Sequence, residues 1–318
     1  MRRIRGAQTT DGWYVREAAI MGTAIRVELW SEDRAQAEAA IEAVLAEMRR
    51  IDAAYSPFKP ESELSRLNRE AAQRAVPVSD EFFALLARAL EFSERSQGAF
   101  DVTFAAVGAL YDYRRGIRPS EAQRTAALQA VGYRHLQLDA STRSVRFARA
   151  GMRIDLGGFA KGYAVDRAAA IVARHGITHA MITAGGDSRI VGDRRGRPWM
   201  IGVRDPRRPG EVVAVLPLAD VAVSTSGDYE RFFEADGRRY HHVLDPRTGE
   251  SPAHVRAVTV IADDGVTAEA LGKCVFVMGA QKGLQFVASY PGADAVVVDA
   301  NGALAYTPGF SDDRHAHR

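Results

Sequence analysis

Residues 153–166 read R-I-D-L-G-G-F-A-K-G-Y-A-V-D and combine three signals that restrict the local fold. Asp155 ends a short apolar strand pattern, Gly157 and Gly158 permit a turn that side chains would obstruct, and a helix pattern begins near Lys161. The first amides of a helix lack partners within the helix, and the helix dipole is positive at that end. The segment therefore predicts an anion site, with phosphate as the commonest guest.

This segment is not a Walker P-loop, because the glycine spacing differs and Gly162, not Ser or Thr, follows the lysine. Taken alone, a glycine-rich turn with a solvated lysine explains it equally well. Further motifs have to decide between the two interpretations.

Composition excludes several classes of protein. The 42 Lys and Arg against 40 Asp and Glu show no basic block interleaved with aromatic residues, which argues against nucleic-acid binding. The single cysteine, Cys274, excludes an intrachain disulfide, and no Cys/His cluster has zinc spacing. No apolar run reaches the length of a transmembrane helix. The basic start M-R-R-I-R has no apolar segment behind it, so we expect a cytoplasmic protein, or a periplasmic one if an export segment is missing.

Helix and strand patterns alternate irregularly along the chain, which predicts an α+β fold with helices packed on an antiparallel or mixed sheet. Residues 25–29 alternate like a half-buried strand, and Ser31 offers an N-cap for a long helix that an apolar stripe predicts after it. Ser79 precedes a second helix pattern, and Asn301-Gly302 lies between two strand patterns as a hairpin turn. We expect an N-terminal segment over residues 1–20, a single domain over 21–310 and a polar tail over 311–318.

A second segment, residues 224–252, reads S-T-S-G-D-Y-E-R-F-F-E-A-D-G-R-R-Y-H-H-V-L-D-P-R-T-G-E-S-P. Together with residues 153–166 it resembles the ApbE family of flavin transferases (FAD:protein FMN transferases). Further similar stretches, in family order, are residues 21–23, 62–68, 98–103, 185–187 and 204–206. The resemblance extends from about Met21 to Gly279. It implies a T-fold-like pair of related α+β subdomains with the flavin nucleotide bound between them.

The resemblance also implies a reaction. A threonine or serine hydroxyl of an acceptor protein attacks the FMN-side phosphorus of FAD, and AMP leaves. The chain lacks the SGAT-type site of an acceptor, so we expect it to modify another protein, an acceptor flavoprotein. Two alternatives stay open: an FAD pyrophosphatase that gives FMN and AMP, and a non-catalytic FAD-binding or maturation protein.

Such a reaction needs a base for the attacking hydroxyl, and histidine titrates near neutrality. In a strand over residues 240–244, His241 and His242 would face opposite ways, so only one could enter the site. The resemblance favours His242 as the base, with Asp245 as its orienting partner, and leaves His241 facing solvent.

Other residues within the family-like motifs are expected to bind FAD, whereas Asp155 and Asp166 could equally be structural caps. The expected flavin- or phosphate-binding residues are Met21, Asp101, Gly157, Gly158, Lys161, Tyr163, Asp187, Ser226 and Gly227.

The chain departs from the family at its metal motif. The family pattern A-D-A-x-x-T, whose Asp and Thr hold Mg²⁺ with a backbone carbonyl, corresponds here to A-E-A-L-G-K, so Glu269 and Lys273 replace the two ligands. Ala160 could still supply the carbonyl, but a protonated lysine repels magnesium.

Three interpretations of this departure remain. Lys273 replaces the metal as a fixed catalytic cation and pairs with Glu269 at i,i+4, or the site is inactive. Alternatively, the two residues form an ordinary surface ion pair and Mg²⁺ binds elsewhere.

Overall fold

The computed structural model describes residues 7–8, 12–208 and 210–310, and these residues are built around one antiparallel sheet. In spatial order its nine strands are β1 (Ala7–Gln8), β2 (Trp13–Ile20), β3 (Thr23–Trp30), β7 (Ala180–Ala184), β8 (Asp187–Val191), β11 (Ala222–Gly227), β14 (Val255–Ala262), β15 (Asp294–Asp299) and β16 (Leu304–Tyr306). Every neighbouring pair in this sheet is antiparallel, so the predicted α+β fold is confirmed.

The sheet consists of two consecutive units with the same order of elements, strand–strand–helix–helix–strand–strand. The first unit is β2, β3, α1 (Arg34–Tyr55), α6 (Ala160–Arg174), β7 and β8. The second is β11, β14, α7 (Gly265–Met278), α8 (Ala280–Ala288), β15 and β16. Strands β8 and β11 pair at the seam, with Ser224 opposite Asp187. This repeat agrees with the pair of related subdomains that the family resemblance implies.

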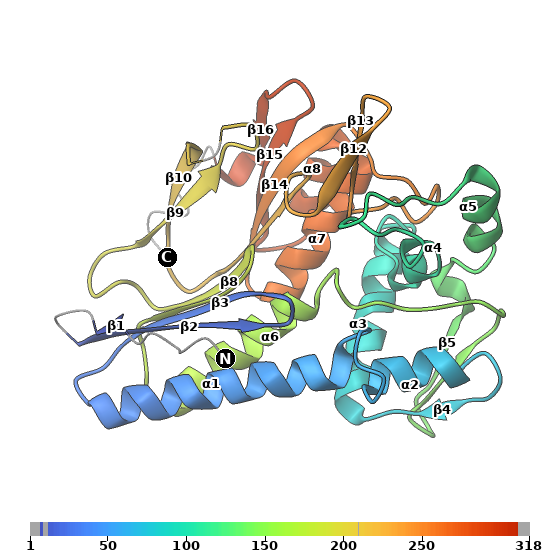
Figure 1. The fold of residues 1–318 in the computed structure, drawn as a ribbon. Helices are drawn as coiled ribbons and strands as arrows, with labels where there is room; N and C mark the ends of the chain where they lie inside the picture. The colour runs from blue at the N-terminus through green and yellow to red at the C-terminus, as the bar shows by residue number, and fades with distance from the viewer. Residues whose placement is uncertain (1–6, 9–11, 209, 311–318) are drawn as a thin grey trace.

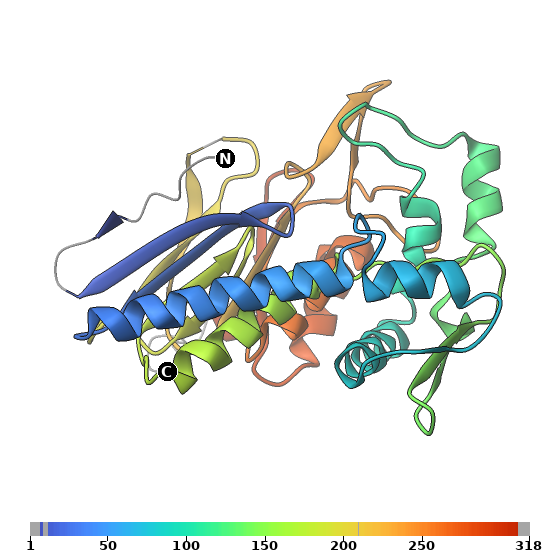
Figure 2. The ribbon, with the colours of Figure 1, turned by 60° about the horizontal axis from the view of Figure 1, so that its bottom comes forward.

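The two faces of the sheet are covered differently. The helices cover one face, where α1 and α6 run side by side across the first unit (Figures 1 and 2). Because side chains alternate along a strand, Ala222 enters this larger core while Val223 faces the opposite side. There a smaller core forms around Trp199, on the two-stranded sheet of β9 (Trp199–Arg204) and β10 (Val212–Leu218).

The remaining elements are insertions into the two units. In the sequence, a helical block with a small sheet is inserted between α1 and α6, and a hairpin is inserted between β11 and β14 of the second unit (Figure 1). The block contains α2 (Glu63–Glu70), β4 (Val76–Pro77), α3 (Asp80–Arg95), η1 (Val102–Phe104), α4 (Ala105–Gly108), α5 (Glu121–Leu128), η2 (Tyr133–His135), β5 (Leu136–Asp139) and β6 (Ser144–Phe147). The hairpin is β12 (Phe232–Ala235) with β13 (Arg238–His241), and the short helix η3 (Pro308–Phe310) follows β16.

Several local expectations are confirmed and two are wrong. Ser79 caps α3, and β15 and β16 pair around the predicted hairpin turn. The predicted cap at Ser31 is wrong, because Asp33 accepts the first free amides of α1 instead. The predicted boundary between an N-terminal segment and the domain, after residue 20, separates β2 from β3. These two strands pair along their whole length within the sheet.

The predicted tail, residues 311–318, lies outside the described residues. Within the part of the chain that the structure describes, none of the helices combines the length and apolar character needed to cross a membrane.

The N-terminal turns of α6 and α7 cross at a pair of glycines. A Cβ atom at Gly162 would overlap the carbonyl oxygen of Gly265, and one at Gly265 would clash with the backbone of Gly162. Backbone contact here brings the two helix beginnings together, because no side chain separates them. The crossing therefore joins the first unit to the second.

Gly162→Ala is expected to lower the free energy of unfolding by about 3 kcal/mol, because backbone on the facing helix cannot yield as a side chain can. Gly272→Ala in α7 is the matched control, since its Cβ would meet Ser226 Oγ at an ordinary 3.6 Å. The control is expected to be neutral or to stabilise by up to about 1 kcal/mol through helix propensity. Urea denaturation measures both, and equal stability of the two variants would contradict the close crossing.

Candidate active site

Charged and hydroxyl side chains gather at the seam between the two units. Lys161 comes from the first turn of α6 and Asp187 from the start of β8, both in the first unit. Glu269 and Lys273 lie one turn apart on α7, and Ser226 lies near the end of β11, all in the second unit. Segments separated by about a hundred residues in sequence thus supply one cluster.

The ammonium group of Lys161 bridges two carboxylates. Its Nζ donates to Asp187 Oδ2 and to Glu269 Oε1. Burial works against the charged lysine, but Asp187 and Glu269 outweigh it and raise the pKa of Lys161. Glu269 Oε2 also accepts the backbone N–H of Gly162 at 2.8 Å. The anion at the N-terminus of α6 is therefore the chain's own Glu269, and Lys161 is not the free phosphate ligand that the sequence predicts.

Lys273 makes a different contact from the predicted one. Its Nζ donates to Ser226 Oγ at 2.7 Å, and no ion pair between Lys273 and Glu269 is found among the described residues. Glu269 is completely buried, so a surface ion pair at i,i+4 is wrong. Burial and the like charge of Lys161 lower the pKa of Lys273 from its ordinary value.

These side chains do not fit Mg²⁺. The ion needs several oxygen ligands in an octahedral arrangement, but the Lys161 ammonium contacts the two carboxylates that would face it. No group of three or more His, Cys, Asp or Glu in the described ranges is arranged to hold a metal ion. The expected contribution of Ala160 and Glu269 to a metal site is therefore not supported.

His242 lies just beyond the end of β13 and faces this cluster of cations. Burial, then Lys273, His241, Lys161 and Arg231 together lower its pKa well below the ordinary value of histidine. Its buried Nδ1 has no hydrogen-bond partner among the described residues. The imidazole is thus neutral near pH 7 and retains an unused buried polar atom, as a proton acceptor or ligand contact requires.

The predicted surroundings of His242 are wrong in two respects. His241 is buried rather than solvent-facing, with Nε2 at 2.8 Å from the carbonyl oxygen of Pro252. The strand ends at His241, so the expected alternation over residues 240–244 does not apply. Asp245 does not orient His242, because both of its carboxylate oxygens accept hydrogen bonds from the Arg247 guanidinium within a turn.

Two further expected ligands have structural partners elsewhere. Asp101 is buried and accepts hydrogen bonds from the backbone amides of Thr103 and Tyr133, which fixes the start of η1. The Tyr163 hydroxyl donates to Glu81 Oε1 at 2.5 Å. Residues two apart on a helix do not share a face, so Tyr163 points away from the cluster that holds Lys161.

The remaining expected ligands lie in turns or in the central strand. Met21 has a left-handed φ of 56° in the turn between β2 and β3. The turn at Gly157 and Gly158 lies beside α7, since a Cβ at Gly158 would lie 3.8 Å from Lys273 Cγ. Gly227 ends β11 where a side chain would overlap the Tyr229 ring.

Of the two aspartates for which capping was the alternative, Asp166 caps a helix and Asp155 holds the turn before α6. Asp155 accepts from the Gly157 amide, and Asp166 accepts from the first amides of α7 at Gly265 and Val266.

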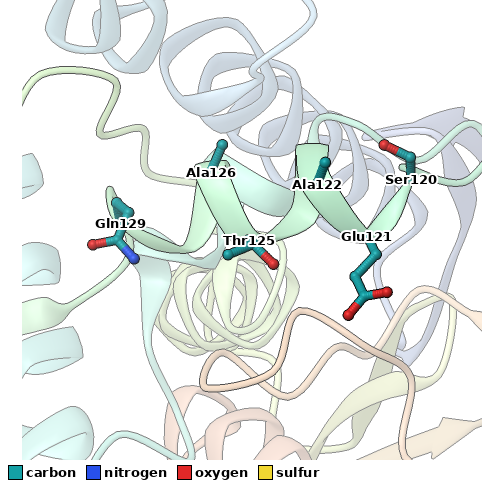
Figure 3. Close-up of a pocket in the computed structure, with 6 residues that line it drawn as sticks. All are labelled: Ser120, Glu121, Ala122, Thr125, Ala126 and Gln129. Atoms are coloured by element: carbon teal, nitrogen blue, oxygen red, sulfur yellow. The ribbon is translucent and has the colours of Figure 1, made fainter.

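Two surface hollows formed by described residues lie away from this cluster. One, of about 720 Å³, is lined only by one stretch of α5 and its cap, from Ser120 to Gln129 (Figure 3). It brings together no basic, metal-ligating or nucleophilic set, so its size carries no functional argument. The other, of about 670 Å³, includes Tyr163 and Asp166 on the far side of α6. The candidate site is therefore identified by its charged and hydroxyl side chains and not by the volume of a hollow.

Sequence reasoning underrated two contributors. Ser224 lies in the central strand β11 and donates to Asp187 Oδ1 at 2.5 Å. Arg231, within the second motif, acts electrostatically on both His242 and Asp155. Its position before the paired histidines was the available signal, since a hairpin brings its two ends together.

Known proteins resemble this chain over most of its length. Residues 21–297 match the model of the ApbE family. The chain is 34% identical over 319 residues to an FAD:protein FMN transferase of Treponema pallidum, covering 94% of this chain and 88% of that protein. It is 32% identical over 278 residues to an FAD:protein FMN transferase of Haemophilus influenzae, covering 83% and 80%.

Solved structures show the same fold. The ApbE protein of Thermotoga maritima superposes with a TM-score of 0.88 at 36% identity, covering 94% of this chain and 98% of that one. The apo form of the flavinyl transferase ApbE from Pseudomonas stutzeri gives a TM-score of 0.83 at 30% identity, covering 97% and 98%. The family match and these relatives span nearly the whole chain, and the chain therefore belongs to the ApbE family.

Proposed function

We propose that this chain is an FAD:protein FMN transferase, which moves FMN from FAD to a threonine or serine hydroxyl of an acceptor protein and releases AMP. The observation that carries the proposal is His242, a half-buried histidine near the cation Lys273, with a lowered pKa and a buried Nδ1 that has no hydrogen-bond partner among the described residues. Family membership supplies FAD as the substrate class.

In the proposed reaction the acceptor hydroxyl attacks FAD while His242 accepts the proton. The acceptor hydroxyl oxygen forms a bond to the FMN-side phosphorus, and the bond from that phosphorus to the bridging oxygen breaks. The hydroxyl proton passes to His242, and AMP carries away the bridging oxygen with its negative charge. Such a transfer depends on positioning and on cations near the phosphate oxygens.

Lys273 is the cation that this site supplies from α7. Lys161 is already neutralised by Asp187 and Glu269, whereas Lys273 contacts only the neutral hydroxyl of Ser226 among the described residues. A bound phosphate favours the charged form of the lysine and offsets the effect of burial. Lys273 therefore occupies the role of a fixed cation, without its predicted pairing to Glu269.

Incubation of the chain with FAD, with and without an acceptor peptide that carries a Thr/Ser target, tests the proposal directly. A flavinylated peptide is the expected product. Free FMN and AMP without peptide labelling would identify a pyrophosphatase instead. Unchanged FAD despite tight binding would identify a non-catalytic FAD-binding protein.

His242→Ala is expected to lower turnover by about 100-fold or more, the usual range for loss of a general base, with similar FAD affinity. The control is His241→Gln, whose side-chain amide has about the reach of the imidazole Nε2 that contacts the Pro252 carbonyl. The control is expected to lower the melting temperature and to leave turnover near that of the native chain, because His241 is a packed structural residue. Similar turnover in both variants would place the base elsewhere.

The dependence of kcat/KM on pH should show an acid limb below pH 6.5, the ordinary pKa of histidine. A base must be neutral, so activity falls as pH falls through the pKa of His242, which burial and Lys273 lower. In Lys273→Met the loss of a neighbouring positive charge should move the remaining activity's acid limb to higher pH. An acid limb above pH 7 in the native chain would contradict this assignment.

Activity of the native chain is expected to survive EDTA, because an ammonium group replaces the metal. Lys273→Met should lower turnover by about 100-fold, while Lys273→Arg should retain more activity because it keeps the charge. The double change Glu269→Asp with Lys273→Thr restores the family pattern: it removes one cation and shortens the carboxylate that Lys161 now contacts. Oxygen ligands are then available, and turnover should depend on added Mg²⁺. A strong requirement of the unmutated chain for Mg²⁺ would overturn the replacement of the metal.

A further inference from the structure

Arg231 lies beside His242 at the open end of the β12–β13 hairpin. The last paired residues of this hairpin are Phe232 and His241, so Arg231 and His242 follow directly opposite each other. The backbone N–H of His242 donates to the carbonyl oxygen of Arg231 at 3.0 Å, which continues the pairing by one step. This backbone contact places the two residues side by side, and the charge of Arg231 helps to lower the pKa of His242.

The guanidinium group of Arg231 has unused hydrogen-bonding capacity. Its one hydrogen bond joins Nη2 to the carbonyl oxygen of Gly22, in the turn between β2 and β3, at a long 3.4 Å. The residue is exposed, and no ion pair of Arg231 is found among the described residues. Guanidinium carries five N–H donors in a planar fork, so most of them remain available.

The other arginines of this hairpin are occupied. Arg239 pairs with Asp228 and Glu234, and Arg238 pairs with Glu250. Arg231 is therefore distinguished from them by its missing carboxylate partner, not by its position on a basic surface.

The surroundings of Arg231 point to a phosphate ligand. Its charge acts on His242 and also on Asp155, which precedes the glycine turn. Lys273 also lies at this turn, with its Cγ 3.8 Å from a Cβ built at Gly158. Lys273 therefore lies at the glycine turn, and Arg231 lies beside the proposed base. In the part of the chain that the structure describes, neither side chain forms an ion pair with a carboxylate.

We propose that Arg231 binds the pyrophosphate of FAD and, together with Lys273, supplies the positive charge that a divalent metal would otherwise provide. The inference rests on the proposed function for the identity of the ligand. A guanidinium group can hold two phosphate oxygens at once, whereas Lys273 acts as a point charge. Arg231 thus orients the pyrophosphate beside His242, and the Gly22 carbonyl is its resting partner.

The test compares the native chain with Arg231→Gln, Arg231→Lys and the control Arg34→Gln. Arg34 pairs only with Glu38 on the exposed start of α1, so the control removes the same charge far from the site. Isothermal titration calorimetry with FAD and with ADP measures affinity for the pyrophosphate group. Arg231→Gln should weaken both ligands about tenfold or more, as expected for a lost charged hydrogen bond. Arg231→Lys should recover part of the loss, and Arg34→Gln should bind like the native chain.

Melting temperatures without ligand separate binding from structure. Arg231→Gln should melt within a degree or two of the native chain, because an exposed residue with one long hydrogen bond contributes little to stability. Unchanged FAD and ADP affinity in Arg231→Gln would overturn the inference even if the chain transfers FMN. Weakened affinity would support it even if transfer is absent, so the two proposals can fail separately. A native chain that binds neither ligand would overturn both.

Discussion

The contact of the Lys161 ammonium with Asp187 and Glu269 holds the two halves of this protein in register at the active site. Lys161 and Asp187 belong to the first unit and Glu269 to the second. Glu269 is fully buried and Asp187 nearly so, and removal of one partner would leave a buried charge without compensation. Breaking a buried pair in this way costs about 3–5 kcal/mol, so the cluster constrains the seam strongly.

The same contact determines which cations remain available to bind the phosphate groups of a substrate. The N-terminus of α6 and its lysine together form a typical anion site, but Glu269 occupies it from within the chain. Positive charge for an incoming phosphate must then come from residues outside this pair. Lys273 and Arg231 are the proposed sources, because among the described residues Lys273 donates to a serine hydroxyl, Arg231 donates to a backbone carbonyl, and neither forms an ion pair. Replacement of the family's metal ligands and the proposed phosphate contacts are thus two consequences of one arrangement of charges.

Much of the fold could be predicted from local pattern. The apolar stripe through Ile41, Val44 and Met48 marks the buried face of α1, because a helical period places these residues on one side. Asn301-Gly302 marks the β15–β16 hairpin for a similarly local reason, the turn geometry that these residues permit. Family-like motifs brought the candidate residues of the site into view, among them His242, Lys161 and Lys273.

The sequence by itself determined the class of fold, the family and the departure at Glu269 and Lys273, since these depend on periodicity and on residue identity. Only the tertiary structure decided which charges meet. Glu269 pairs with Lys161, 108 residues away, and not with Lys273 one turn further on. Asp245 lies three residues from His242 yet holds Arg247. A side chain takes the partner that packing brings within a few ångströms in a low-dielectric site, and that distance is set by the crossing of α6 and α7 and by strand register across the seam.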